Sequence, residues 1–347
     1  QRQMCIRDRL STIYTTSSFA KESEDQLYNV LYINSYHEGY KWSDDIKSTM
    51  EAVFAGAPVA IEVETFYLDT QRLPVEQPEA YYNSIAQSLA YKIQYRDYDA
   101  IITSDDAAYE FVMDYGDVFS SKTPHLFCGV NKQSNAYTSK QRPTGGVMEY
   151  LDIEETLSLI IQLNPDVKDV YYVIDESLTG KASLENFLSV SKTFEDRLSF
   201  QALEGRNMSE LVEKASELPE DAVLFYIMFY YDEEGNYFNY EEGVHLLAQR
   251  ASVPMYSLWE FYIGHGVLGG KVSSGEEQGR AVAEMALDYF TKEGYELFIT
   301  TENENAYKFD FRYLDKFNIP LEALPEGSDV VNFSMRKQKE VLLSLIH

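Results

Sequence analysis

Neighbouring carboxylates are the residues of this sequence best suited to acid–base chemistry. Asp105 and Asp106 follow the apolar run Tyr98–Thr103, and a second acidic group follows another apolar run at 232–234. Adjacent carboxylates can act as general acid and base where the surroundings raise one pKa. Acidic residues directly after a strand also stabilise the positive end of the next helix, which is the alternative explanation. One hypothesis is therefore a secreted enzyme that uses Asp105, Asp106 and Glu260; we prefer a domain without catalytic activity.

Patterns typical of metal and phosphate chemistry are missing. The five histidines are scattered without an H-x-x-x-H or H-E-x-x-H pair, and neither Cys5 nor Cys128 has a partner at metal-ligand spacing. The glycine-dense stretch IGHGVLGG at 263–270 lacks both the lysine–serine ending of a P-loop and the spacing of a dinucleotide loop. The sequence accordingly predicts no metal site and no cofactor.

The net charge of the chain limits the classes of partner that it can bind. Its 347 residues carry a formal net charge of -28 at pH 7, whereas nucleic-acid binding needs a basic face. The sequence therefore predicts no nucleic-acid partner. It also has no run of the roughly 18 apolar residues that a membrane helix requires.

The elements that position these residues follow one repeated unit of apolar strand, polar turn and helix. The first unit has a strand at Val30–Ile33, a turn at Asn34–Gly39 and a helix with Ser43 as its expected N-cap. A similar unit surrounds Asp105, and a further series runs from 167 to 251. Such repetition predicts an α/β fold of two lobes with a cleft between them.

Ligands of open α/β sheets bind beyond the carboxyl ends of the strands, so the side chains that follow the strands form the predicted site. Their rings and polar groups suit a sugar, an amino acid, a nucleoside or another small molecule. The first lobe is expected to contribute Ser35, Tyr36, Trp42, Ser104, Asp105 and Asn131. The second lobe or hinge is expected to contribute Asp175, Tyr230, Asp232, Trp259 and Glu260.

The two ends of the sequence differ from the rest. QRQMCIRDR at 1–9 and the last residues, 344–347, look like translated sequencing-adapter read-through. Between 10 and 20 the small residues Ser18 and Ala20 flank Phe19, as before a signal-peptidase cut. We therefore expect an exported, extracytoplasmic protein whose signal peptide is largely missing here.

Several stretches together resemble a known family. They are LYINSYHEGYKW (31–42), FYLDTQR (66–72), YDAIITSDD (98–106), LFCGVN (126–131), WEFYIGHGVLGG (259–270) and NIPLEALPEGSDVVN (318–332). They resemble the extracytoplasmic substrate-binding proteins of ABC transporters with the type I periplasmic-binding fold. The likeness is closest to the version that precedes the membrane helix of bacterial sensor histidine kinases and diguanylate cyclases.

The resemblance implies two doubly wound α/β lobes and a domain that closes on a small molecule between them. Its further partner would be its own downstream transmembrane signalling region, or an ABC permease if the protein is a free solute receptor. The resemblance also implies three crossings between the lobes, the second of them surrounding Gly264, Gly266, Gly269 and Gly270. The expected division is a leader at 1–25, a first lobe at 26–131 and 270–298, a second lobe at 147–262 and 303–325, crossings at 132–146, 259–270 and 299–307, and an extended tail at 326–347.

Overall fold

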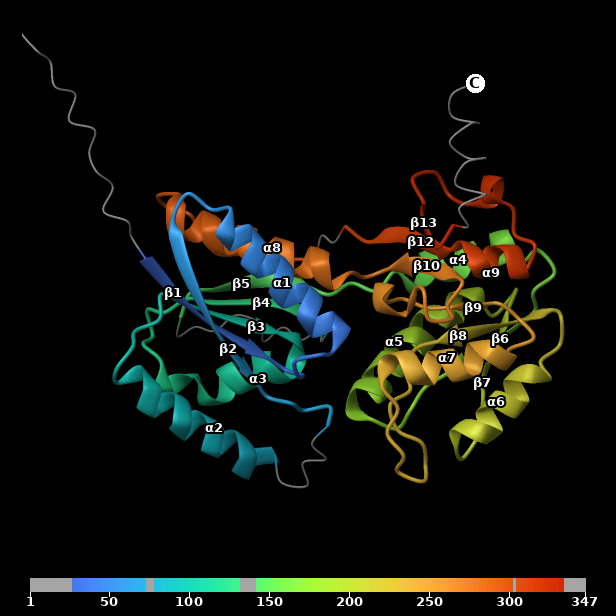
Figure 1. Ribbon diagram of the computed structural model, residues 1–347, viewed down its shortest axis with the longest axis horizontal. Coiled ribbons are helices and arrows are strands. Elements are labelled where there is room, and N and C mark those ends of the chain that lie inside the picture. Colours follow the sequence, from blue (N-terminus) through green and yellow to red (C-terminus); the bar gives the residue numbers. More distant parts are fainter. Residues whose placement is uncertain (1–26, 73–77, 132–141, 302–303, 334–347) are drawn as a thin grey trace, which may run out of the picture.

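The computed structural model describes residues 27–72, 78–131, 142–301 and 304–333, which form two α/β lobes lying side by side (Figure 1). The predicted leader at 1–25 and the end of the predicted tail lie outside the described residues. The first lobe contains a six-stranded sheet in the order β11-β5-β4-β3-β1-β2. Its strands are β1 (Leu27–Asn34), β2 (Ala60–Tyr67), β3 (Ala100–Ser104), β4 (His125–Val130), β5 (Thr144–Met148) and β11 (Ile299–Thr300). Its helices are α1 (Lys41–Ala55), α2 (Pro78–Ile93), α3 (Asp105–Tyr115), η1 (Gly116–Val118) and α8 (Gly275–Thr291).

The second lobe contains a seven-stranded sheet in the order β13-β12-β10-β9-β8-β6-β7. Its strands are β6 (Asp169–Val173), β7 (Ser199–Ala202), β8 (Ala222–Tyr226), β9 (Met255–Tyr256), β10 (Gly269–Val272), β12 (Ala306–Asp310) and β13 (Asp329–Val331). Its helices are α4 (Ile153–Leu163), α5 (Leu178–Ser191), η2 (Lys192–Phe194), α6 (Met208–Ser216), α7 (Tyr240–Arg250), η3 (Glu260–Tyr262), α9 (Phe311–Lys316) and η4 (Leu321–Ala323).

Both sheets repeat one doubly wound strand order. In the first, β2-β1-β3-β4-β5 are parallel neighbours, and β7-β6-β8-β9-β10 repeat that order in the second. β12 then adds to β10 in the antiparallel direction. The predicted fold class of two doubly wound lobes is confirmed.

Strand β1 shows why the sequence specifies this layering. Its four central residues are fully buried, Val30 and Tyr32 in one hydrophobic cluster and Leu31 and Ile33 in another. Successive side chains of a strand point to opposite faces, so a continuous apolar run requires cover on both. Residues of α1 and α8 belong to the first cluster and residues of α2 and α3 to the second, and Figure 1 shows these helix pairs on opposite faces.

The chain passes between the lobes after β5, after β10 and after β11. These passages differ from the expected boundaries, since β5 at 144–148 pairs with β4 in the first sheet instead of crossing. Residues 132–141 of that expected crossing lie outside the described residues. The expected crossing at 259–270 belongs to the second lobe, where β10 pairs with β9 and β12. The third passage falls within the expected 299–307. The expected tail from 326 includes β13, which pairs with β12.

Two local predictions are wrong. Helix α1 begins at Lys41 with Tyr40 as its N-cap, while the buried Ser43 donates its hydroxyl hydrogen to Asn34 Oδ1 at 2.9 Å. Gly269, taken as a hinge residue, lies inside β10, where an added Cβ would stand 2.2 Å from Phe309 Cδ1 and 2.7 Å from Lys308 O. The glycine is there because two strands and a ring approach closely, which is a packing requirement.

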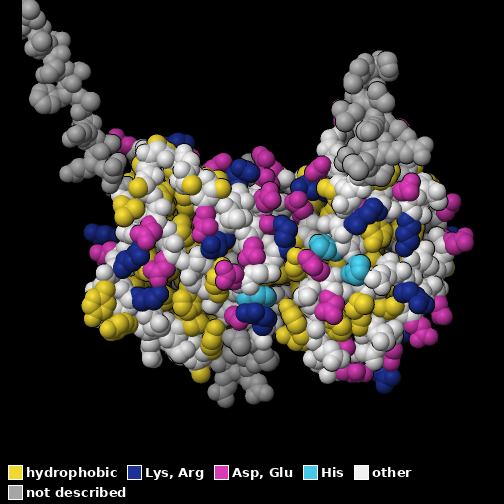
Figure 2. All heavy atoms as spheres, viewed as in Figure 1, with side chains coloured by type: hydrophobic (Ala, Val, Ile, Leu, Met, Phe, Trp, Pro, Cys, Tyr) yellow, Lys and Arg dark blue, Asp and Glu magenta, His cyan; other side chains and the backbone are white. Residues whose placement is uncertain are grey.

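The surface agrees with the acidic composition. Figure 2 shows aspartate and glutamate side chains spread over both lobes on the displayed face, interspersed with lysine and arginine. Among the helices of the described residues, none combines the length and apolar character needed to cross a bilayer.

Candidate ligand-binding site

The carboxyl ends of both sheets hold the candidate site. The strand order reverses between β1 and β3 in the first sheet and between β6 and β8 in the second. Such switch points are where open α/β sheets bind ligands, because the connecting loops diverge there. Tyr36 follows β1 and Asp105 follows β3, while Asp175 follows β6 and Tyr230 follows β8.

Aromatic side chains from both lobes meet between these switch points. The hydroxyl groups of Tyr40 from the first lobe and Tyr230 from the second lie 2.8 Å apart. The ring of Phe261, at η3 in the second lobe, lies 5.7 Å from that of Tyr40 and 6.2 Å from that of Trp42 by centroid distance, in edge-on arrangements. Tyr231 also donates its hydroxyl hydrogen to Gln71 O at 3.0 Å. The two lobes therefore touch across the cleft.

Two buried carboxylates each accept a hydrogen bond from an indole. Trp42 Nε1 donates to Asp105 Oδ1 at 2.9 Å, and Trp259 Nε1 donates to Glu149 Oε1 at 2.9 Å. Glu149 directly follows β5 of the first sheet, and Trp259 follows β9 of the second, so the second bond joins the two lobes. Phe261 lies 6.5 Å from Trp259 by centroid distance and so contacts both indoles.

These carboxylates bind protons more tightly than ordinary ones. Burial raises the pKa of Asp105 well above its usual value, and the charge of Glu149 raises it further. Burial also raises the pKa of Glu149 to about 7, although hydrogen bonds to its carboxylate act in the opposite direction. The site thus holds two neighbouring carboxyl groups whose protonated forms are favoured by burial.

The backbone around Asp105 is strained as well. Asp105 has φ 67°, in the left-handed region that non-glycine residues rarely adopt. Gly129 on β4 has the same φ, and an added Cβ there would lie 3.0 Å from Asp105 Oδ1. Strained residues of this kind cluster at functional sites, where the surroundings hold them in place.

The structure brings together five of the predicted site residues. They belong to one group of contacting side chains, linked through Tyr40 and Phe261: Tyr36, Trp42, Asp105, Tyr230 and Trp259. The exposed Asn131 lies beside this group, because its hydrogen bond to Glu149 acts on the pKa of that carboxyl. Their role in ligand binding stays a prediction.

Three predicted residues use their polar atoms inside one lobe instead. Ser35 Oγ donates to Ser104 O at 2.7 Å and accepts from Ala108 N at 2.8 Å, which fixes the start of α3. Ser104 Oγ bonds the hydroxyl group of Tyr32 at 2.9 Å. Asp175 Oδ2 accepts from Tyr230 N at 2.7 Å, so this carboxylate positions Tyr230 from behind.

Two further predicted residues bond their carboxylates within the second lobe. Asp232 accepts hydrogen bonds from the backbone nitrogens of Glu234 and Asn236 and from Asn236 Nδ2, so it builds the turn after Tyr231. Glu260 forms an ion pair with Lys308 of β12. Both residues were expected to reach the cleft because they follow strands. Instead, the carboxylate of Asp232 bonds the turn that follows it, and that of Glu260 pairs with a residue of β12.

Sequence reasoning missed Glu149, Tyr40 and Phe261. Glu149 follows an apolar strand, which is the signal used elsewhere, but residues from 147 onward were expected in the second lobe. Tyr40 lies between Tyr36 and Trp42, which were both predicted, and was left out. Phe261 lies in the stretch that was assigned to a crossing.

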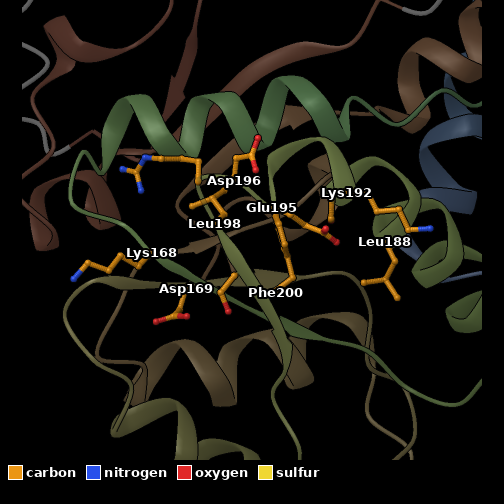
Figure 3. A pocket seen from close by; sticks show the side chains of 11 residues that line it. Lys168, Asp169, Leu188, Lys192, Glu195, Asp196, Leu198 and Phe200 are labelled. Atoms are coloured by element: carbon orange, nitrogen blue, oxygen red, sulfur yellow. The ribbon is translucent and has the colours of Figure 1, made fainter.

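A hollow of about 680 Å³ lies elsewhere, at the opposite end of the second sheet (Figure 3). Its lining includes Lys168 and Asp169 at the start of β6 and Ser199 and Phe200 at the start of β7. These are the amino ends of the strands, whereas ligands of such sheets bind at the carboxyl ends. We therefore place the candidate site between the lobes.

The sequence matches no protein-family model and no curated protein. Solved structures are similar in fold. An ABC domain from Streptococcus pneumoniae in complex with L-Trp has a TM-score of 0.62 at 12% identity, covering 88% of this chain and 100% of that one. A ligand-free, open substrate-binding protein from Clostridium difficile has a TM-score of 0.61 at 12% identity with the same coverage.

A third similar structure is the periplasmic binding protein of an arabinose ABC transporter from Shewanella sp. ANA-3. Its TM-score is 0.52 at 11% identity, and the match covers 92% of this chain and 99% of that one. The fold is therefore that of the type I periplasmic-binding proteins, as the resemblance implied. The likeness to sensor domains in particular stays a prediction.

Proposed function

We propose that this chain is an extracytoplasmic small-molecule receptor domain, without catalytic activity, that closes on its ligand between the two lobes. The observation that carries the proposal is the meeting of both switch points at one group of buried aromatic and acidic side chains, with Tyr40 and Tyr230 in contact across the lobes. A protein that recognises a small molecule by hinge closure needs side chains from both lobes around one site.

The similar structures support this reading by what they bind. One holds L-Trp, another holds L-arabinofuranose, and a third is described as ligand-free and open. In a receptor of this kind the lobes are apart without ligand and close around it, and this change of conformation reports that the ligand is bound. The hydroxyl contact between Tyr40 and Tyr230 would break on opening.

Within this class we favour a sensor domain of a membrane-bound signalling protein over a free solute receptor of an ABC transporter. The support is the likeness of 318–332 to the end of such sensor domains. In this stretch β13 pairs with β12, and Asn332 Nδ2 donates to Asp310 Oδ2 at 3.0 Å. A signalling segment that followed would be attached to the second lobe and would follow its motion. Sequencing the intact gene decides, since a stop codon soon after Asn332 rules out the sensor.

The test of the receptor function is a thermal-shift screen against sugars, amino acids, nucleosides and purines, followed by X-ray scattering. A ligand at about 100 times its Kd adds about 2.7 kcal/mol to the free energy of unfolding. We expect at least one class to raise the unfolding midpoint and to reduce the radius of gyration. A screen in which no class does either contradicts the proposal. Catalysis that consumes a hit over many turnovers and disappears in Asp105→Ala favours the enzyme instead.

A further inference from the structure

Only one carboxylate oxygen of Asp105 has a hydrogen-bond partner among the described residues. The side chain is 4% exposed, and Trp42 Nε1 bonds its Oδ1. Its Oδ2 is buried and has no hydrogen-bond partner among the described residues. A buried carboxylate oxygen without a partner is costly, because it has lost its water and gained nothing in return.

The charges closest to Asp105 make this cost larger. Those that act on it most are Glu149 and Asp106, both acidic. Among the described residues, none of the largest electrostatic influences on Asp105 comes from a cation, whereas buried carboxylates require a positive partner.

The surroundings of the two carboxylates indicate what that partner is. Trp42 and Trp259 each bond one of them, and the ring of Phe261 lies 6.2 and 6.5 Å from these two indoles by centroid distance. Aromatic faces attract organic cations, and aromatic groups with carboxylates are how proteins bind ammonium groups. Among the described residues no group of three or more histidine, cysteine or acidic side chains is arranged to hold a metal ion.

We propose that Asp105 and Glu149, flanked by Trp42, Phe261 and Trp259, bind the positively charged nitrogen of a small organic ligand. The inference rests on the proposed receptor function and names the ligand class. Asp105 Oδ2 provides the free acceptor, the indole bonds hold both carboxylates in position, and Tyr36 and Asn131 stand at the more exposed side.

Binding of such a ligand is coupled to proton release. The titratable groups around Asp105 are Glu149, Asp106 of α3, Tyr36, Tyr32 of β1 and Cys128 of β4. Burial raises the pKa of both tyrosines and of the cysteine well above their usual values, so these three stay neutral near pH 7. The two carboxyls titrate instead, because a cation favours their ionised forms and expels their protons.

The experiment uses probe pairs of equal shape that differ in charge. The first is choline with 3,3-dimethylbutan-1-ol, its neutral carbon isostere, and the second is L-tryptophan with indole-3-propionate, which lacks the ammonium group. Calorimetry of the full chain at pH 7 in phosphate and in Tris measures affinity and proton release together. We expect the cationic member of at least one pair to bind at least about tenfold tighter than its partner. Its enthalpy should also differ between the two buffers. The pair that binds distinguishes a quaternary ammonium from an α-amino acid.

Variants assign the effect to the site. Asp105→Asn keeps the acceptor for Trp42 and removes the charge, so it should weaken the cationic probe at least about tenfold and leave the neutral one unchanged. Asp232→Asn, a similarly buried carboxylate in a turn of the second lobe, is the matched control and should change neither. The unfolding midpoint of each variant reports that it folds.

The proposal fails if neutral and cationic members bind equally, if Asp105→Asn weakens both alike, or if no cationic probe binds at about 10 mM. Its failure is separable from that of the receptor function. A neutral sugar that binds and compacts the protein keeps the receptor and removes the cation site. If nothing in the broad screen binds, both fail.

Discussion

Asp152 and Asn305 lie in two different passages between the lobes, and Asp152 accepts a hydrogen bond from Asn305. Asn305 Nδ2 lies 2.8 Å from Asp152 Oδ2 and also donates to Tyr150 O at 2.7 Å. Asp152 Oδ1 forms an ion pair with Lys271 Nζ at 3.0 Å, and Lys271 lies in β10 just before the remaining passage. One buried carboxylate thus ties together all three connections, where any motion of one lobe against the other must bend the chain.

Replacing this carboxylate should therefore cost stability. In Asp152→Ala Lys271 keeps only the longer contact with Glu155 and Asn305 only its bond to Tyr150 O, and we expect the free energy of unfolding to fall by roughly 1–3 kcal/mol. Asp221→Ala is the control, because its ion pair with Lys168 is exposed to solvent and contributes little to stability. Urea unfolding of the two variants gives the comparison. Equal losses in both would show that the Asp152 cluster has no special weight.

The second prediction concerns the contact between Tyr40 and Tyr230. Tyr40→Phe removes the hydroxyl bridge between the lobes but keeps the ring, so the change in stability should be about 0.5–1.5 kcal/mol. The balance should shift towards an open form, seen as a larger radius of gyration by X-ray scattering without ligand. Tyr256→Phe removes a hydroxyl that accepts from Asn164 Nδ2 inside the second lobe, and it should leave the radius unchanged. An unchanged radius in Tyr40→Phe contradicts the bridge.

The third prediction follows from Glu149. Burial raises its pKa from the usual 4.5 to about 7, so between these values the folded protein binds more protons than the unfolded chain. The free energy of unfolding then falls as pH rises through that window. Glu149→Gln keeps the acceptor for Trp259, and it should stabilise the protein by roughly 1–3 kcal/mol at pH 8 and hardly at all at pH 4. Thermal unfolding across this range measures it, and a gain that is independent of pH would point to a different cause.

Local sequence signals predicted most of the fold. The buried strand at Val30–Ile33 appears as expected, because a continuous apolar run reports burial directly. The passages between lobes were misplaced because they depend on strand pairing. Nothing in Thr144–Met148 tells which of two similar sheets the strand joins. Partners distant in sequence decide that.

The site was predictable to the extent that its residues follow strands. Trp42, Asp105 and Tyr230 were found in this way. Glu149 was not, since its strand had been placed in the other lobe, and Asp232 was included although it forms a local turn. Which polar side chain faces a cleft and which closes a turn depends on backbone geometry that composition does not record.

The last prediction concerns Gly269, the residue first chosen as a hinge. An alanine there would place its Cβ 2.2 Å from the ring of Phe309 and 2.7 Å from Lys308 O, so β10 and β12 would have to separate. We expect Gly269→Ala to lower the free energy of unfolding by about 1–3 kcal/mol, as overpacking does, without changing the radius of gyration. Gly235→Ala is a useful contrast, because no atom lies within 4 Å of an added Cβ there and only its φ of +82° resists the change. If Gly269→Ala instead alters the open–closed balance and leaves stability unchanged, bending does involve β10. Close packing would then not be the reason for a glycine at this position.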